Sequence, residues 1–168
     1  DNVIDYAMVI FYGGNLDAAI TWFGGDRWHN NWHGIRNRSG DEGFKFFIWD
    51  AEHTFLVESM NKGLHEDRTG PFPAGQQFGS SNPQWLWQQC LENEEFRMRA
   101  ADRIHELYYG EGLLTPKAVR AIVTKRMHEI ESAVICESAR WGDAARRDNP
   151  LNRDCLLYTS DAADDSLR

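Results

Sequence analysis

The residues best suited to chemistry lie in a polar loop and in a short acidic turn further along the chain. The loop, "NLDAAITWFGGDRWHNNW" at residues 15–32, holds Asp17, Asp26 and Asn31 among glycines and tryptophans. The turn begins at Asp50, directly after the aromatic run "FKFFIW". Carboxylate and amide oxygens suit Mg²⁺ or Mn²⁺, a carboxylate can accept a proton, and loops on rigid scaffolds carry much of protein chemistry. A turn-rich connector, whose Asn and Asp side chains bond only the local backbone, is the alternative.

Histidine and cysteine give little support for a zinc site. His29 and His33 are four residues apart, but they lie where a loop enters a predicted strand and lack the helical HExxH pattern. Cys90 and Cys136 show neither CxxC spacing nor a Cys/His ligand pattern. The spacing therefore argues against a zinc hydrolase.

The elements around these segments are a helix and a hairpin. Residues 2–12 place apolar side chains at helical spacing, and two consecutive glycines end the predicted helix. "WHGIRNR", "SGDEG" and "FKFFIWD" together are typical of a β-hairpin. This hairpin matters for the site, because it would bring Asn31 at its start beside Asp50 at its end.

The second half of the chain is predicted to be helical after a loop over residues 51–83. One helix is expected to start at Pro83, with Ser81 or Asn82 as its cap, and a second to cover residues 93–109. The longest helix is expected to run from Thr115-Pro116 to about Trp141 and to stop at Gly142. Its apolar residues fall on one face: Val119, Ile122, Val123, Met127, Ile130, Val134 and Ile135. The order of elements predicts an α+β fold that is mostly helical.

Composition restricts the possible partners. The chain has 168 residues and a formal charge of −8, from 18 basic and 26 acidic residues, and the basic residues form no stripe. Nucleic acid is therefore not an expected partner. No apolar run approaches the length of a membrane span and no signal peptide opens the chain. Since the sequence starts inside an apparent helix and without Met, we expect it to begin within a larger protein.

Three motifs carry a resemblance to a known family. "FYGGNLD", "HNNW" and "IWDAEHT" follow one another as they do in the CotH kinase family, named after a spore-coat protein kinase with an atypical kinase fold. The HRD and DFG tripeptides of ordinary protein kinases are absent. The resemblance covers about residues 1–145. It implies a fragment of a kinase-like fold, the C-terminal lobe with one small hairpin over residues 1–148, without the N-lobe and the flanking domains of the parent chain.

The resemblance also implies roles for individual residues. Asp17 would orient and deprotonate the acceptor hydroxyl, while Asn31 and Asp50 would bind the magnesium or manganese ions on ATP. Asp26 stands five residues before Asn31, the spacing of HRDxxxxN, and is the alternative to Asp17; the N-x-D pattern of the family favours Asp17. Glu52 could add a metal contact, since alternate residues of an extended segment share a face, or it could be a solvent-facing or Arg-paired carboxylate.

The implied function is transfer of the ATP γ-phosphate to a hydroxyl group of an unknown protein. The isolated chain is expected to be inactive, because half of the triphosphate clamp is an N-lobe lysine. The parent is expected to be an active bacterial protein outside the cytoplasm. Two other functions stay open: a non-catalytic kinase-like scaffold or binding module of a surface protein, and a glycoside hydrolase with paired carboxylates such as Asp17 and Asp50.

The last residues of the chain are expected not to belong to the natural protein. "CLLYTSDAADD", residues 155–165, resembles the translation of a common transposase-type sequencing adapter. Residues 149–168 are therefore expected to be an irregular tail, of which 155–168 are adapter read-through with too little apolar surface to offset the entropy of ordering.

Overall fold

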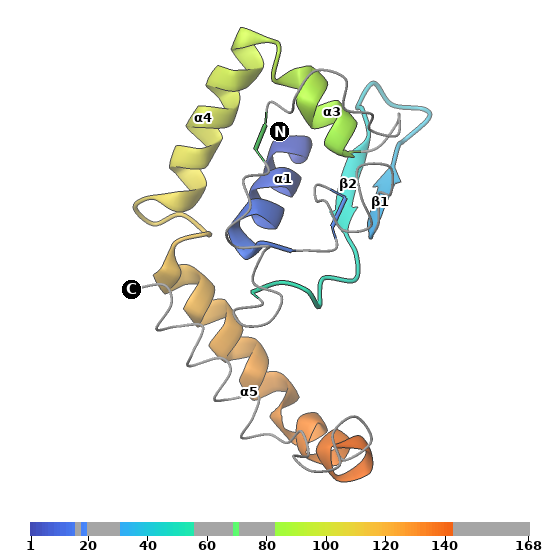
Figure 1. Ribbon diagram of the computed structural model, residues 1–168, viewed down its shortest axis with the longest axis vertical. Helices are drawn as coiled ribbons and strands as arrows, with labels where there is room; N and C mark the ends of the chain where they lie inside the picture. Colours follow the sequence, from blue (N-terminus) through green and yellow to red (C-terminus); the bar gives the residue numbers. More distant parts are fainter. Residues whose placement is uncertain (16–17, 20–30, 56–68, 71–82, 143–168) are drawn as a thin grey trace. The chain divides into compact units, whose positions relative to one another are not determined.

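The computed structural model describes residues 1–15, 18–19, 31–55, 69–70 and 83–142. Within these residues the chain forms four helices and one two-stranded antiparallel sheet (Figure 1). The elements, in chain order, are α1 (Asn2–Gly13), β1 (Trp32–Ile35), β2 (Lys45–Ile48), α3 (Pro83–Cys90), α4 (Glu94–Tyr108) and α5 (Pro116–Trp141). The expected α+β, mostly helical fold is confirmed. The chain divides into two compact units, residues 1–107 and 108–168, which are described separately.

Helix α1 is the centre of the first unit and lies between α4 and β2 (Figure 1). Its apolar residues recur at helical spacing, and Ile4, Ala7 and Ile10 are buried. Helix α3 packs against it through Trp87, whose ring meets that of Phe11 edge-on at 5.6 Å. Buried aromatic pairs of this geometry add to the stabilisation from burial itself, so α1 and α3 form the aromatic part of the core.

The hairpin is fixed to α1 by its second strand. Strands β1 and β2 pair antiparallel, with Trp32 opposite Ile48 and Gly34 opposite Phe46. Phe46 is buried, and its ring lies 6.0 Å from that of Tyr6 on α1. Since alternate residues of a strand face opposite sides, Phe46 turns inward while its neighbours Lys45 and Phe47 are exposed.

Two arginines of α4 hold the first turns of α1. Arg99 donates from Nε and Nη2 to the carboxylate of Asp1, at 2.6 and 2.9 Å. Arg103 makes the same forked contact with Asp5, at 2.6 and 3.1 Å, and also reaches Glu106. These hydrogen bonds raise the pKa of the Arg103 guanidinium. Forked arginine–carboxylate pairs fix geometry as well as charge, so they set how α4 lies along α1.

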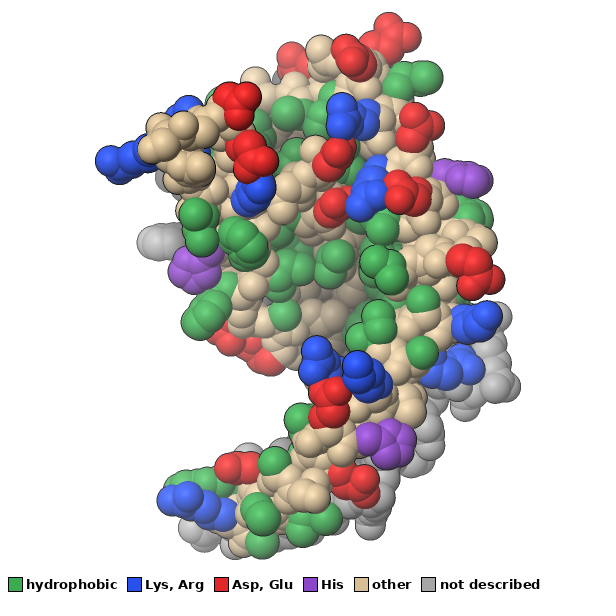
Figure 2. Space-filling view, turned by 180° about the vertical axis from the view of Figure 1, so that it is seen from behind, with side chains coloured by type: hydrophobic (Ala, Val, Ile, Leu, Met, Phe, Trp, Pro, Cys, Tyr) green, Lys and Arg blue, Asp and Glu red, His purple; other side chains and the backbone are tan. Residues whose placement is uncertain are grey.

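Helix α5 of the second unit has a side-chain cap and a proline at its N-terminus. The hydroxyl of Thr115 accepts a hydrogen bond from the Ala118 N–H, and Pro116 occupies the first helical position. Gly142 ends the helix with a right-handed backbone, so the chain does not use its freedom to adopt positive φ there. None of the helix residues is buried, and charged and apolar side chains alternate along its length in Figure 2. The predicted apolar face is only partly covered: Val119, Met127 and Val134 are half-buried, whereas Ile122, Val123, Ile130 and Ile135 are exposed.

The helix predictions agree with the structure to within about two residues, which is the usual uncertainty at helix ends. Helices α3 and α5 begin at the predicted prolines, and α4 lies inside the predicted range. The cap residues Ser81 and Asn82 lie outside the described residues, as do the predicted adapter tail and most of the loop over 51–83. No helix in the described part of the chain is long and apolar enough to cross a membrane.

Candidate functional site

The site region begins at the C-terminal end of α1, where Gly13 and Gly14 have different structural roles. Gly14 has φ of 57°, the left-handed conformation that glycine adopts without strain, and its N–H closes the helix on carbonyls of the last turn. Gly13 allows close approach, because a Cβ there would lie 2.5 Å from Cγ2 of Thr54. The Gly13 carbonyl then accepts a hydrogen bond of 2.8 Å from the Phe55 N–H. The segment that follows the hairpin is therefore tied directly to the end of α1.

The hairpin brings Asn31 and Asp50 to one end of the sheet. Trp32 pairs with Ile48 as the last pair of the ladder. Asn31 precedes this pair by one residue and Asp50 follows it by two, so both leave the sheet at its open end. Asn31 is half-buried and Asp50 is exposed. The prediction that the hairpin juxtaposes these two segments is thus supported by the register.

Two residues at this end of the hairpin, and one in the turn that follows, have a strained backbone. Asn31, Asp50 and Phe55 have φ of 52°, 50° and 58°, and they are the non-glycine residues with positive φ in the described ranges. This conformation is uncommon for any residue with a Cβ and is an outlier for a bulky aromatic. Strained residues of this kind cluster at functional sites, where the surrounding structure holds them in place. The clustering marks the open end of the hairpin as the candidate site.

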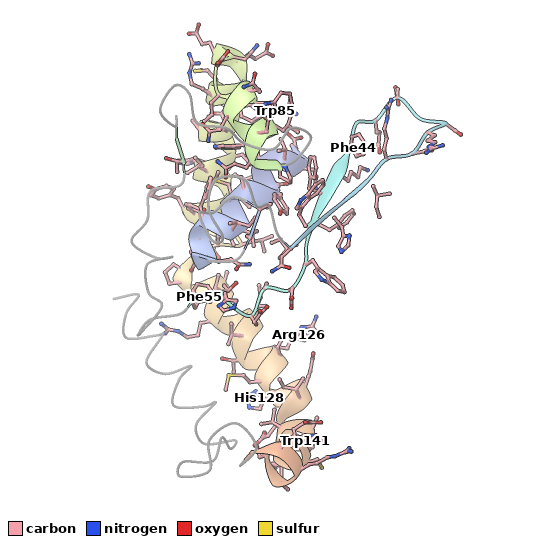
Figure 3. All side chains as sticks on the ribbon, turned by 45° about the vertical axis from the view of Figure 1, so that its right-hand side comes forward. Phe44, Phe55, Trp85, Arg126, His128 and Trp141 are labelled. Atoms are coloured by element: carbon pink, nitrogen blue, oxygen red, sulfur yellow. The ribbon has the colours of Figure 1, made fainter. Side chains whose placement is uncertain are left out.

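Phe55 is held in its strained conformation by α1. Its ring meets that of Tyr12 edge-on at 5.8 Å, and Figure 3 labels it below the C-terminal end of α1. Between Asp50 and Phe55, the side chains of Glu52 and His53 lie 3.4 Å apart and Glu52 is mostly exposed. This turn is therefore anchored at Phe55 and presents its carboxylates, Asp50 and Glu52, to solvent.

Comparison with known proteins identifies the family. The model of the CotH kinase protein family matches residues 1–164. The chain belongs to the CotH kinase family. The match runs past residue 145, where the motif resemblance ends, and into the segment interpreted as adapter read-through; the origin of that segment stays a prediction. Searches of the curated proteins and of the solved structures found no match.

Kinase family membership suggests use of a nucleotide and a metal in general terms, and the described donors fit a hard metal ion. Within the described ranges no three His, Cys, Asp or Glu side chains gather closely enough to hold a metal by themselves. Asn31 and Asp50 offer one amide and one carboxylate, which matches the way Mg²⁺ shares its coordination between one or two carboxylates and substrate phosphates. His33 packs its ring edge-on against Trp49 at 5.2 Å. The amide of Asn31 and the carboxylate of Asp50 in this CotH-family chain are oxygen donors of the kind that hard metal ions prefer.

Asp17, which is predicted to be catalytic, its alternative Asp26, and His29 lie outside the described residues. Their roles stay predictions. Asn15, the last described residue before Asp17, is buried, and its N–H donates to the Ile10 carbonyl at 3.3 Å. The loop that carries Asp17 therefore starts from a fixed point at the end of α1, on the same glycine turn that binds Phe55.

Sequence reasoning missed two features of this site. It assigned no task to Thr54 and Phe55, although they explain why Gly13 precedes Gly14. The signal was available in the sequence, because a helix C-cap needs only one left-handed glycine and a second glycine beside it often marks close backbone approach. The left-handed conformation of Asn31 and Asp50 could also be suspected, since Asn and Asp tolerate it best.

Proposed function

We propose that this CotH-family chain supplies the metal-binding and acceptor-activating part of a kinase, which transfers the γ-phosphate of ATP to a protein hydroxyl with Mg²⁺ or Mn²⁺. The observation that carries the proposal is the pair of left-handed residues, Asn31 and Asp50, at one end of the hairpin. A folded chain retains such strain where position matters more than stability. The family membership favours phosphotransfer over the glycoside hydrolase alternative.

The proposed division of labour follows from side-chain chemistry. Asp50 supplies a full negative charge for the divalent ion, and Asn31 supplies a neutral carbonyl oxygen. The bound ion would neutralise charge on the phosphates during transfer. Asp17 would accept the proton of the attacking hydroxyl, and the loop that carries it follows the buried Asn15. The protein contributes mainly position and charge, which are the principal requirements of phosphoryl transfer.

The experiment exploits the left-handed backbone. Asp50→Gly and Asn31→Gly each remove a ligand but keep the conformation, and they relieve strain of roughly 1 kcal/mol. We expect binding of Mn²⁺–ATP, measured by isothermal titration, to weaken by at least about tenfold for Asp50→Gly and less for Asn31→Gly. The unfolding free energy, measured with urea, should stay unchanged or rise. Opposite effects on binding and stability distinguish a ligand from a structural residue.

Two variants serve as controls for the titration. Glu42→Gln removes an exposed carboxylate in the loop at the opposite end of the hairpin, where it pairs with Lys45, and should leave Mn²⁺–ATP binding unchanged. Asp17→Asn should also leave binding within about twofold, because a proton acceptor is not required to hold the metal. Retention of full Mn²⁺–ATP affinity by Asp50→Gly would overturn the proposal. A gain in stability without loss of binding would show that Asp50 strain has another origin.

A further inference from the structure

The two edges of the hairpin differ in how their backbone groups are satisfied. At β2, the side-chain amide of Asn2 receives a hydrogen bond of 2.5 Å from the Phe46 N–H and donates one of 3.2 Å to the Phe46 carbonyl. The amide thus occupies the position that a neighbouring strand would take. Exposed edges are sites of unwanted pairing, and proteins cover them in this way. The β2 edge faces α1 and is capped at its centre.

The β1 edge has no such cap. Because the N–H and C=O of Phe46 turn toward Asn2, Phe46 and Gly34 form a pair without ladder hydrogen bonds. In an antiparallel pair of this type the backbone groups of both residues point outward. Gly34, and by the same alternation Trp32, therefore direct N–H and C=O away from β2. In the described part of the chain no hydrogen bond reaches these groups of Trp32 and Gly34.

The surroundings of this edge are apolar on one face and carry two arginines at one end, in a hairpin loop that also holds Asp41 and Glu42, the latter paired with Lys45. Ile35 is 64% and Phe47 is 47% exposed, and both lie on the sheet face that is turned away from α1. Arg36 and Arg38 follow β1 directly, are exposed, and make no ion pair with any other described residue. In Figure 3 the hairpin projects away from the helices, with Phe44 labelled beside β2. Along β1, His33, Gly34 and Ile35 are exposed and Trp32 is half-buried.

We infer that the outer edge of β1 binds an extended, acidic segment of a partner protein as a third strand. The outward backbone groups of Trp32 and Gly34 provide the hydrogen bonds of strand addition. Ile35 contacts an apolar residue of the segment on the face that Phe47 of β2 extends, and Arg36 and Arg38 pair with its acidic end. The inference does not depend on phosphotransfer, since none of these residues is a proposed metal ligand.

A second copy of the chain fits this edge less well. Four strand residues span only about 13 Å, so pairing of two β1 edges alone would bury far less surface than stable dimers require. The arginines of two copies would also contribute like charges to one small interface. Charge complementarity therefore favours an acidic partner segment, and self-association becomes an outcome that the experiment can detect.

Amide hydrogen exchange of the 168-residue chain, followed by NMR, tests the inference at single residues. The probe is a capped synthetic peptide with the sequence EVTVTVE. In the free protein we expect the amides of His33 and Ile35 to exchange slowly and those of Trp32 and Gly34 to exchange fast. At saturating peptide the Trp32 and Gly34 amides should slow by at least tenfold, because a new strand accepts their hydrogen bonds.

Matched controls separate strand addition from other binding. The same peptide with N-methyl groups at alternate residues cannot complete the ladder and should give no slowing. Charge reversal by Arg36→Glu with Arg38→Glu should weaken EVTVTVE binding by at least tenfold, whereas Lys117→Glu with Lys125→Glu, which changes the net charge equally on α5, should not. Slow exchange at His33 and Ile35 in every variant verifies that the hairpin is folded.

Three results would overturn the inference. The first is an unchanged exchange rate at Trp32 and Gly34 in millimolar EVTVTVE. The second is equal binding of the N-methylated peptide, which would mean that the backbone edge is not used. The third is slowing at Trp32 and Gly34 that depends on protein concentration without peptide, which would identify a second copy as the occupant. Mn²⁺–ATP binding by the same samples reports on the proposed metal site separately.

Discussion

In α1, Ile4 and Ile10 are each 1% exposed and Ala7 is 0% exposed, whereas in α5 Ile122 and Ile135 are 50% and 52% exposed. Both helices carry apolar residues at helical spacing, and α5 is more than twice as long as α1. The difference lies in the neighbours. Helix α1 is covered by α3, α4 and β2, while α5 has no buried residue. Helical spacing predicts that a face exists, but only packing determines whether it becomes core.

The two helices are also stabilised at their ends in different ways. Helix α1 has no side-chain hydrogen bond at its N-cap, Asp1, whose carboxylate instead binds Arg99 of α4. Helix α5 has the Thr115 cap, Pro116 in its first turn, and local pairs such as Arg126 with Glu129. Among the described residues, α1 is bonded at its start to another helix, whereas the cap and the ion pair of α5 are local.

The largest expected change in unfolding free energy comes from the same substitution, isoleucine to alanine, made in each of the two helices. Ile10→Ala should reduce the unfolding free energy by about 2–5 kcal/mol, because it removes buried surface and leaves a cavity. Ile122→Ala should change it by no more than about 0.5 kcal/mol, as is usual for an exposed position. Urea unfolding followed by circular dichroism measures both. A loss of several kcal/mol for Ile122→Ala would show that α5 is covered in solution and would remove the contrast.

The next effect concerns the side-chain amide that joins α1 to the hairpin. Asn2→Ala should cost about 1–3 kcal/mol, because it leaves the N–H and C=O of Phe46 without their partners. Asn2→Asp keeps an acceptor for the Phe46 N–H and should cost less. Faster amide exchange at Phe46 in Asn2→Ala is the direct readout. Unchanged exchange there would mean that Asn2 does not cap the β2 edge.

Removal of the local cap tests α5 in the same manner. Thr115→Ala should destabilise α5 by about 1 kcal/mol, since the Ala118 N–H loses its acceptor. Thr115→Ser keeps the hydroxyl and should retain most of the stability. Circular dichroism at 222 nm during thermal unfolding would show the loss as reduced helicity at intermediate temperature. If Thr115→Ala has no effect on helicity, contacts elsewhere stabilise α5, and the view that its N-terminal cap matters is wrong.

Much of this fold could be predicted from the sequence because its signals are local. Proline at the first helical position, glycine after the last turn and the hairpin composition each act within a few residues, and the helices begin and end close to where those signals stand. The exposure of the α5 face could not be predicted, since the same periodicity appears in covered and uncovered helices. Burial of Trp87 but not of Trp85 likewise depends on which side of α3 meets α1.

The candidate site was predictable only in part. The placement of Asn31 and Asp50 at one end of the hairpin follows from its register, which composition and spacing indicate. The contacts of Asn2 with Phe46, and of Gly13 with Phe55, join residues more than 40 positions apart in the chain. Such contacts depend on how elements pack, and no local pattern announces them. The metal-ligand and catalytic roles came from family resemblance and stay predictions.

The smallest expected change in unfolding free energy at neutral pH concerns the buried hydroxyl of Tyr6 on α1. The hydroxyl oxygen of Tyr6 has no hydrogen-bond partner among the described residues, and burial raises the pKa of this phenol. Tyr6→Phe should therefore change the unfolding free energy at pH 7 by less than about 1 kcal/mol, because no partner is lost. The ring contact with Phe46 is kept.

The sign of the pH effect follows from which state loses the proton first. Below pH 10 the phenol is neutral in both states. Above it the unfolded chain ionises while the folded chain resists, so ionisation favours unfolding and stability falls as pH rises. Tyr6→Phe removes this contribution, and its urea midpoint should decline less between pH 9 and pH 11 than that of the original protein. If the urea midpoints of Tyr6→Phe and of the original protein declined equally, another group would cause the loss of stability at alkaline pH. Burial of the Tyr6 hydroxyl would then not be the cause.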